Sequence, residues 1–256
     1  MKAIILAAGE GTRMRPLTLT TPKPLIKIAG KPMIEYLIDL LRLHGVKEIG
    51  INLFYKGDNI KAYLGNGVKL RVKIKYLQED QLTGTAGGVK KVAKLLQVNE
   101  PFFVISSDMM VNFNLTDIYN FHKKSRGIAT ISCYWRPTEK ILNKSGVVIF
   151  EPGTKKINNF VEKPKTSKEV ISNWVNSSVY VFNPKIVNYI PDKINGSTTV
   201  DLPKDIFPIL MNKNESLFAF SIDKNKYYQM GVDTPDRIST VEEDIKKGVF
   251  IPAFID

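Results

Sequence analysis

The sequence predicts an α/β protein with a mostly parallel sheet, because strand-like and helix-like segments alternate along its first half. Short apolar runs predict strands at 3–6, 49–53, 71–77 and 102–106. Apolar residues at helical spacing predict helices between them, over 34–41, 58–64 and 89–96. Such alternation is typical of right-handed βαβ units, whose ligands lie beyond the carboxyl ends of the strands.

The second half of the sequence has fewer helical segments and a looser pattern. A polar helix is expected over 114–124, and strand-like segments follow at 128–135, 146–150, 156–161 and 177–182. Pro235 then opens a last helix, which carries an apolar face. We interpret this half as a subdomain folded onto the sheet and not as an independent domain.

Composition and charge narrow the class of partner. The chain is 43% hydrophobic and 24% charged, which is ordinary for a globular protein. The formal net charge of +12 suits an anionic ligand and would also suit nucleic acid. The basic residues are dispersed, however, and no run of five or more Lys or Arg occurs. We therefore expect no nucleic-acid partner.

Targeting signals and cysteine chemistry are also missing from the sequence. No apolar run has the length of a membrane span, and the start lacks the pattern of a signal peptide. The single Cys133 excludes an intrachain disulfide and provides no metal cluster. These features predict a cytoplasmic protein without a membrane partner.

The loop after the first predicted strand has the residues of a polyphosphate site. Gly9 and Gly11 allow backbone N–H groups to approach a ligand closely. Arg13 and Arg15 follow and supply planar charged donors suited to phosphate. Lys23 comes next, between two prolines that stiffen the backbone around it. Solvated arginines beside a simple glycine turn are the alternative, but they do not account for all these features in one loop.

Two commoner phosphate motifs do not match this loop. The Walker A pattern G-x-x-x-x-G-K-[ST] occurs nowhere in the chain. In the dinucleotide fingerprint G-x-G-x-x-G, Met14 stands where the third glycine belongs. The loop is therefore a different kind of phosphate site.

Asp108 follows the most apolar of the predicted strands and is a candidate Mg²⁺ ligand. Mg²⁺ prefers one or two carboxylates together with phosphate oxygens and water. The alternative is that this carboxylate caps the following turn.

A second loop, 78–88, has amides and glycines that suit a nucleobase. An amide side chain can both donate and accept hydrogen bonds, so Gln78, or Gln81 in its place, could read a base edge. Gly84 and Thr85 stand at a predicted helix start, where N–H groups point outward. A plain loop with a helix cap would produce the same spelling.

Segments 9–18 and 22–25 closely resemble the signature of the sugar-1-phosphate nucleotidylyltransferases, which make dTDP-glucose, UDP-glucose and GDP-mannose. The resemblance covers about residues 1–240 and implies a Rossmann-like, three-layer nucleotidyltransferase fold with a mixed, mostly parallel central sheet and a small sugar-binding subdomain. It implies a single domain over 1–256, with a nucleotide-binding half at 1–112, a sugar-phosphate-binding half at 113–240, and a C-terminal helix and tail at 241–256. The hexapeptide repeats of some relatives are absent, so no acetyltransferase domain is expected.

The resemblance also implies an activity and its residues. A nucleoside triphosphate would donate its nucleotidyl group to a hexose 1-phosphate, with glucose 1-phosphate favoured and Mg²⁺ as cofactor. The implied nucleotide-binding residues are Ala8, Gly9, Gly11, Thr12, Arg13, Gln78, Gly84 and Thr85. The implied catalytic residues are Arg13, Lys23, Asp108 and Lys163.

The sugar side of the family pattern is matched with departures. The tripeptide at 162–164 resembles the family's E-K-P motif, in which Glu162 would hold the hexose and Lys163 its 1-phosphate. Both can serve one ligand only if the backbone turns there, which Pro164 favours. Gly146 and Asn176 match two further sugar-binding elements. Ser145 and Ser178 replace an aromatic residue and a glycine of those elements, which leaves the sugar open.

The segment 229–235 departs further from the family. Gly231 stands where most relatives have their second metal aspartate, and Asp233 stands where they have glycine. This spelling resembles the enzymes that activate the sugar acid Kdo with CTP. We therefore predict that Asp108 and Asp233 share the metal, with a turn at positive φ near Gly231. The alternative is that Asp233 caps the last helix.

Several alternatives stay open from the sequence. The base, the sugar and the oligomeric state, including a homo-oligomer, are not determined. A mannose-1-phosphate guanylyltransferase is one alternative activity. A non-catalytic regulator that binds a nucleotide sugar on the same fold is another.

Overall fold

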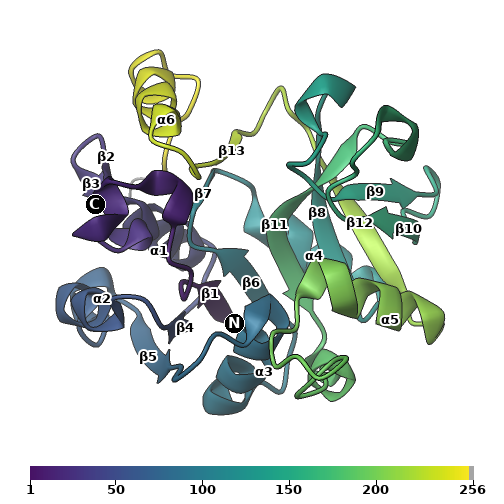
Figure 1. The fold of residues 1–256 in the computed structure, drawn as a ribbon, viewed down its shortest axis with the longest axis horizontal. Helices are drawn as coiled ribbons and strands as arrows, with labels where there is room; N and C mark the ends of the chain where they lie inside the picture. The colour runs from purple at the N-terminus through teal and green to yellow at the C-terminus, as the bar shows by residue number, and fades with distance from the viewer. Residues whose placement is uncertain (254–256) are drawn as a thin grey trace.

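A nine-stranded mixed sheet forms the centre of the molecule in the computed structural model, which describes residues 1–253 (Figure 1). Its strand order is β10-β9-β11-β6-β1-β4-β5, and β8 pairs with both β11 and β12. The strands are β1 (Lys2–Leu6), β4 (Glu48–Leu53), β5 (Lys73–Gln78), β6 (Phe102–Ser106), β8 (Ala129–Trp135), β9 (Val147–Phe150), β10 (Ile157–Val161), β11 (Trp174–Phe182) and β12 (Leu217–Ile222).

The remaining elements surround this sheet. Two short antiparallel pairs are β2 (Lys27–Ile28) with β3 (Lys31–Pro32), and β7 (Met109–Val111) with β13 (Gln229–Gly231). The α-helices are α1 (Met33–Leu43), α2 (Gly57–Leu64), α3 (Gly84–Leu96), α4 (Leu115–Ser125), α5 (Phe207–Asn212) and α6 (Asp236–Lys246).

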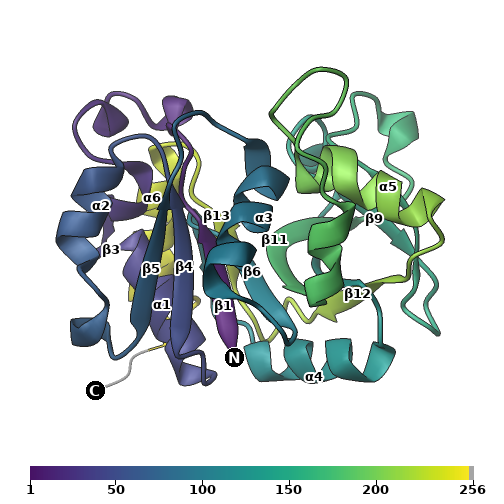
Figure 2. The ribbon, with the colours of Figure 1, turned by 90° about the horizontal axis from the view of Figure 1, so that it is seen from below.

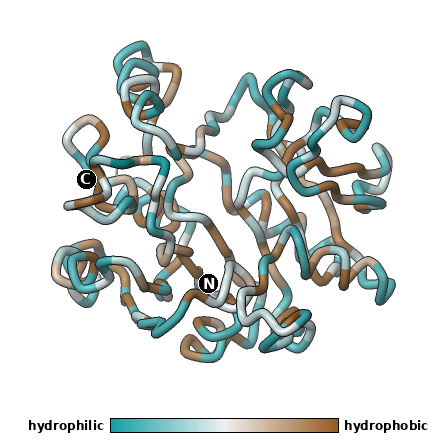
Figure 3. The backbone as a smooth tube through the Cα atoms, in the orientation of Figure 1, coloured by the Kyte–Doolittle hydropathy of each residue, from teal (hydrophilic) through white to brown (hydrophobic). Residues whose placement is uncertain are grey.

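Helices on both faces of the sheet make a three-layer fold, as predicted (Figure 2). Successive side chains of a strand point to opposite faces. Ile5 of β1 therefore belongs to a core with α1, α2 and α4, whereas its neighbour Ile4 belongs to a core with α3 and α5. Both residues are fully buried, which explains the continuous apolar run of this strand. Hydrophobic stretches accordingly follow the inner strands in Figure 3, and hydrophilic ones the outer helices and loops.

The strand order creates a crevice at the carboxyl end of β1. β1 pairs in parallel with β4 on one side and with β6 on the other. The chain visits β4 and β5 first and only then returns to β6, so the order reverses at β1. Ligands of open α/β sheets bind at such a switch point. Ser107 N donates to Leu6 O at 3.0 Å, which ties the ends of β1 and β6 together there.

The two halves of the chain share this sheet. β11 runs antiparallel to β6, with Val179 opposite Ile105. The register of β11 against β8 shifts between Asn176 and Tyr180, and Ser178 lies there at a φ of 55°. An L residue at positive φ is uncommon, so the bulge fits the glycine that stands here in the family pattern that this segment resembles.

Several predicted boundaries were wrong, each for a local reason. β11 begins at Trp174, three residues before the predicted start, because its first residues pair with the end of β8. β5 begins at Lys73 because Arg71 adopts a left-handed conformation. α6 begins at Asp236, so the C-terminal helix is not confined to 241–256. β12 was not predicted from the sequence. Gly231 does not have the positive φ expected of it and ends the regular strand β13.

Candidate active site

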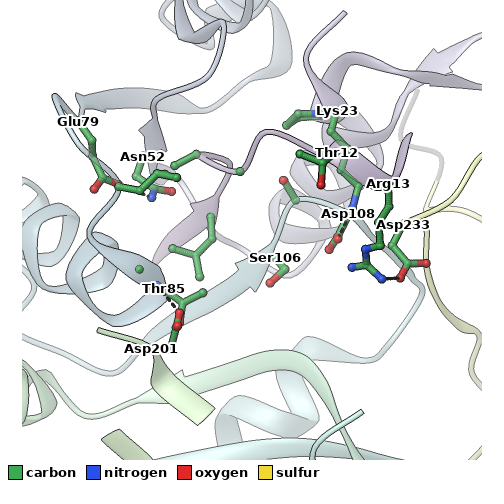
Figure 4. A pocket seen from close by; sticks show the side chains of 18 of the residues that line it. Thr12, Arg13, Lys23, Asn52, Glu79, Thr85, Ser106, Asp108, Asp201 and Asp233 are labelled. Atoms are coloured by element: carbon green, nitrogen blue, oxygen red, sulfur yellow. Dashed lines mark hydrogen bonds and ion pairs between the residues drawn. The ribbon is translucent and has the colours of Figure 1, made fainter. Parts of the chain in front are cut away.

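A pocket of about 380 Å³ lies at the carboxyl ends of β1 and β6 (Figure 4). Most of the residues predicted for the nucleotide and its phosphates line it, namely Ala8, Gly9, Gly11, Thr12, Arg13, Lys23, Gly84 and Thr85. Asp108 and Asp233 line it as well. Residues far apart in the sequence therefore meet at the edge that the strand pattern indicated.

The glycine loop is shaped by a close approach to its own continuation. Gly11 has a φ of 64°, and a Cβ atom there would lie 3.0 Å from Thr18 Cγ2 and 3.1 Å from Lys23 Cβ. Glycine is therefore required at this turn on two grounds. Thr18 Oγ1 donates to Gly11 O at 2.9 Å and holds the loop closed over Lys23.

Two ion pairs lie beside the glycine loop. Lys23 Nζ lies 2.5 Å from Asp108 Oδ2, and Arg13 forms an ion pair with Asp233. Met14, the residue after Arg13, is fully buried in a cluster with Val232. This packing anchors the loop to the C-terminal part of the chain. Asp233 does not cap the last helix, because Pro235 is the N-cap of α6 and no side chain bonds to the helix start.

At the other end of the pocket, a buried carboxylate holds the loop that precedes α3. Glu79 accepts hydrogen bonds from Asn52 Nδ2 at 2.7 Å and from Thr83 N at 3.2 Å, and a further one from the Thr83 hydroxyl. Asn52 in turn accepts from Ala7 N at 2.9 Å, so β1, β4 and the loop are connected. Sequence reasoning missed Asn52 and Glu79, because nothing in their local spelling indicates that they meet.

The two glutamines proposed to read the base do not line this pocket. Gln78 is exposed at the end of β5, and its amide donates only a long 3.5 Å bond to Glu79 O. Gln81 is exposed on the loop and is likewise outside the lining. Asn52 and Glu79 occupy the place expected for them. The cause is the pleat of β5, which turns Gln78 away when Glu79 turns inward.

A segment from the second half closes over the same loop. Val200 N donates to Thr83 O at 3.0 Å, and Ala86 N donates to Val200 O at 2.9 Å. Asp201 Oδ1 accepts from the backbone and the hydroxyl of Thr85, both at 3.1 Å. A Cβ on Gly84 would lie 2.3 Å from Val200 O, so this glycine permits the contact. Asp201 was also missed, because its role depends on packing between the halves.

A second pocket contains the residues predicted for the sugar phosphate. Gly146, Glu162, Lys163 and Asn176 all line it. Lys163 has a φ of 46°, so the backbone does turn at the E-K-P motif, and Lys163 Nζ lies 3.9 Å from Glu162 Oε1. A Cβ on Gly146 would lie 2.6 Å from Glu162 Oε2, which explains the glycine. Burial raises the pKa of Glu162, and the charge of Lys163 opposes that shift.

Hydrogen bonds hold the bulge of β11 against this pocket. Asn176 Nδ2 donates to the Tyr180 hydroxyl at 2.8 Å, and Asn176 Oδ1 accepts from Ser178 N at 2.9 Å. Ser178 itself lines the pocket. The bulge therefore orients the amide and leaves a serine hydroxyl at the pocket wall.

The two pockets share Arg13, Asp108 and Asp233. Figure 4 shows these three side chains gathered at one end of the first pocket. A ligand in each pocket would therefore place its nearest groups beside the same arginine and the same two carboxylates.

A family model described as nucleotidyl transferase matches residues 2–246 of the chain. The chain belongs to this nucleotidyl transferase family. A UTP–glucose-1-phosphate uridylyltransferase of Synechocystis sp. is 35% identical over 233 residues, which are 87% of this chain and 58% of that protein. A mannose-1-phosphate guanyltransferase of Yarrowia lipolytica is 35% identical over 92% of this chain and 61% of its own length. The chain thus spans about three fifths of the length of these relatives.

Solved structures confirm the fold of the chain. A protein described as a glucose-1-phosphate thymidylyltransferase from Bacillus anthracis superposes with a TM-score of 0.81 at 21% identity, covering 95% of this chain and 96% of that one. A UDP-glucose pyrophosphorylase complexed with UDP-glucose superposes with a TM-score of 0.80 at 20% identity, covering 96% and 98%. Within residues 1–253, no helix has the length and apolarity needed to cross a bilayer.

Two carboxylates of the chain fit a divalent metal whose remaining coordination positions are filled by substrate phosphates and water. Among residues 1–253, no group of three or more His, Cys, Asp or Glu side chains could enclose an ion by itself. Asp108 and Asp233 are two half-buried carboxylates at the junction of two pockets. Magnesium is commonly bound by one or two carboxylates together with substrate phosphates and water.

Proposed function

We propose that this chain transfers a nucleotidyl group from a nucleoside triphosphate to a hexose 1-phosphate and releases pyrophosphate. The observation that carries the proposal is the junction of the two pockets at Arg13, Asp108 and Asp233. A sugar-phosphate oxygen and an α-phosphorus bound on either side would meet at this point. In phosphoryl chemistry of this kind, positioning and charge stabilisation account for most of the catalysis.

The glycine loop would hold the triphosphate. Ala8, Gly9, Gly11 and Thr12 line the first pocket together with Arg13 and Lys23, and the backbone N–H groups of such a glycine loop would bind phosphate oxygens. Arg13, whose side chain is 69% exposed, can swing from Asp233 to the leaving pyrophosphate. Lys23, whose side chain is only 12% exposed, is held in place and would stabilise the charge that builds on the α-phosphate.

The second pocket would orient the attacking group. Lys163 would bind the 1-phosphate and hold its oxygen in line with the α-phosphorus. Glu162 and Asn176 would bind the hydroxyls of the hexose, one as an acceptor and the other as donor and acceptor.

Magnesium is the metal we propose for Asp108 and Asp233. Bound there, it would supply positive charge to the triphosphate oxygens and bring them into register. The same two carboxylates form ion pairs with Lys23 and Arg13.

Glucose 1-phosphate is the favoured acceptor, and the uridylyltransferase of Synechocystis supports it by its name. Mannose 1-phosphate with GTP is the second candidate, supported by the guanyltransferase of Yarrowia lipolytica. Asn52 and Glu79 stand where the base would enter, but their polar atoms are already bonded to the protein. Base selection is therefore expected from the shape and backbone groups of the loop.

A pyrophosphate-release screen tests the proposal. Each of UTP, dTTP, GTP, CTP and ATP is combined with glucose, mannose, galactose and N-acetylglucosamine 1-phosphates, with and without Mg²⁺. We expect metal-dependent release for at least one pair. A nucleotide-sugar-binding regulator would bind ligands in calorimetry and release no pyrophosphate with any pair. That result would reject the proposed enzymatic activity in favour of a regulator.

A further inference from the structure

Three cations at the outer end of the second pocket have no carboxylate partner. Arg136, Lys144 and Arg237 all line this pocket. Within residues 1–253, none of the three forms an ion pair, although other basic residues of the two pockets, Arg13 and Lys23, do. The contrast separates the outer end of the pocket from its junction.

Arg136 is the most constrained of the three. It directly follows β8, and its backbone is fixed on both sides by Asn173, because Arg136 N donates to Asn173 O and Asn173 Nδ2 donates to Arg136 O, both at 2.8 Å. Its guanidinium donates only one long bond, from Nη2 to Gln229 Oε1 at 3.3 Å. Its Nε atom is buried and makes no hydrogen bond to any described residue. An unpaired buried donor is costly, so the described residues leave this guanidinium incompletely satisfied.

The surrounding charges compensate this guanidinium only in part, because Asp233 and Tyr134 act on its pKa against burial and Arg237. Asp233 is paired with Arg13, and Asp236 is bonded to Thr234. Burial, and then the positive charge of Arg237, lower the pKa of Arg136. The region therefore has an excess of positive charge that solvent does not fully screen.

The same cations also line a further pocket beside the sugar site. An outer pocket of about 340 Å³ continues the second one and shares Arg136, Lys144, Asp236 and Arg237 with it. Glu162, Lys163 and Asp233 do not line this outer pocket. The three cations therefore lie on the side of the sugar site that faces away from the junction. The 1-phosphate would lie on the junction side, where Lys163 already serves it.

From this geometry we propose that Arg136, with Lys144 and Arg237, binds a second anionic group of the sugar substrate, distant from its 1-phosphate. The inference rests on the proposed function and narrows its acceptor to sugar 1-phosphates that carry a further carboxylate or phosphate. The planar guanidinium of Arg136 suits either group, since both present two acceptor oxygens side by side.

Matched ligands test the second charge. Glucose 1-phosphate, glucuronic acid 1-phosphate and glucose 1,6-bisphosphate share one ring configuration and differ only at C6. Calorimetry measures their binding to the full chain, and pyrophosphate release measures their turnover with the best triphosphate. We expect one of the anionic sugars to bind at least about tenfold more tightly than glucose 1-phosphate, the scale of one charge-assisted hydrogen bond. Comparison of the two anionic sugars identifies the carboxylate or the phosphate as the group.

Variants assign the effect to the cluster. Arg136→Met should abolish the advantage of the anionic sugar and leave the affinity for glucose 1-phosphate unchanged. Arg126→Met removes the same charge from an exposed position outside the pockets and should keep the advantage. If Arg136→Met lowers the melting temperature, Lys144→Met and Arg237→Gln replace it and should each reduce the advantage.

Two results would overturn the inference. One is equal or tighter binding of glucose 1-phosphate compared with both anionic sugars. The other is an equal loss for all three ligands in Arg136→Met, which would assign Arg136 to the shared 1-phosphate. Binding without any turnover would contradict the proposed function alone, because calorimetry measures the preference independently of catalysis.

Discussion

Lys23 Nζ lies 2.5 Å from Asp108 Oδ2, and Arg13 and Asp233 form a second pair beside them. Each pair joins a cation proposed for phosphate with a carboxylate proposed for metal. Both pairs must separate when a metal–triphosphate complex binds, because the cations then contact phosphate and the carboxylates contact the ion. Binding of the metal and of the triphosphate should therefore be coupled, and each should strengthen the other.

Asp108→Asn should have opposite effects on binding and on turnover. With metal removed by EDTA, the variant frees Lys23 and should bind triphosphate about fivefold more tightly than the wild type, the effect of an ion pair worth about 1 kcal/mol. With Mg²⁺, its turnover should fall by about 10²–10³. Calorimetry and pyrophosphate release measure the two effects. Unchanged or weaker metal-free binding would show that the pair does not compete with the ligand.

Asp233 should contribute to the metal site as strongly as Asp108. Asp233→Asn should therefore raise the Mg²⁺ midpoint of pyrophosphate release as severely as Asp108→Asn does. Asp58→Asn changes an exposed carboxylate on α2 in the same way and should retain the wild-type midpoint. A wild-type midpoint and kcat in Asp233→Asn would remove this residue from the metal site.

Lys163 should act on one substrate only. Lys163→Ala should raise the KM for the sugar phosphate far more than the KM for the triphosphate, because this side chain lines the second pocket and not the first. Lys165→Ala, two residues further on and exposed, is the matched control and should leave both KM values unchanged. Equal increases in both KM values would mean that Lys163 contacts the triphosphate as well.

Glu79 should act through the position of its loop. In Glu79→Gln one acceptor oxygen is replaced by a donor, so one of the bonds to Asn52 and Thr83 is lost. We expect the free energy of unfolding to fall by about 1–3 kcal/mol. The KM for triphosphate should rise about tenfold, which corresponds to a loss of about 1.4 kcal/mol of binding free energy when the loop is displaced. The KM for sugar phosphate should stay unchanged. Asp80→Asn, the exposed neighbour, is the control. A stability loss without any change in the triphosphate KM would limit Glu79 to folding.

The sequence allowed the elements and the phosphate loop to be predicted because both depend on local pattern. The apolar run of β1 and the glycines after it imply a buried strand and a tight turn wherever the chain folds. The E-K-P motif could be interpreted in the same way, since Lys163 does turn at positive φ.

Residues whose role depends on distant partners could not be predicted. Asp201 bonds to Thr85 across 116 residues of sequence, and Asn52 bonds to Glu79 across 27. Gln78, or Gln81 in its place, was expected to read the base because of its amide chemistry, whereas the pleat of β5 turns Glu79 and not Gln78 toward the pocket. Arg136 escaped notice because a single arginine after a strand is ordinary, and only packing leaves its Nε without a partner.

Sugar binding should weaken in acid at a higher pH than an ordinary carboxyl would cause. Burial raises the pKa of Glu162 in the folded protein, so this carboxylate is protonated at a higher pH than an ordinary glutamate. A protonated Glu162 loses acceptor capacity for sugar hydroxyls. The KM for sugar phosphate should therefore rise on the acid side, and Glu162→Gln should have a uniformly high KM without that limb. An acid limb that persists in Glu162→Gln would assign the titration to another group.

The central claim is that a sugar phosphate and a triphosphate react where the two pockets meet. Phosphorus-31 NMR of the best substrate pair with Mg²⁺ tests it most directly, with Arg13→Ala as the control variant and its melting temperature measured in parallel. We predict equal amounts of a nucleotide-sugar diphosphate and pyrophosphate from the wild type, and a rate lower by about 10²–10³ in a folded Arg13→Ala. Release of inorganic phosphate without formation of the nucleotide sugar, or wild-type rates in Arg13→Ala, would contradict the account.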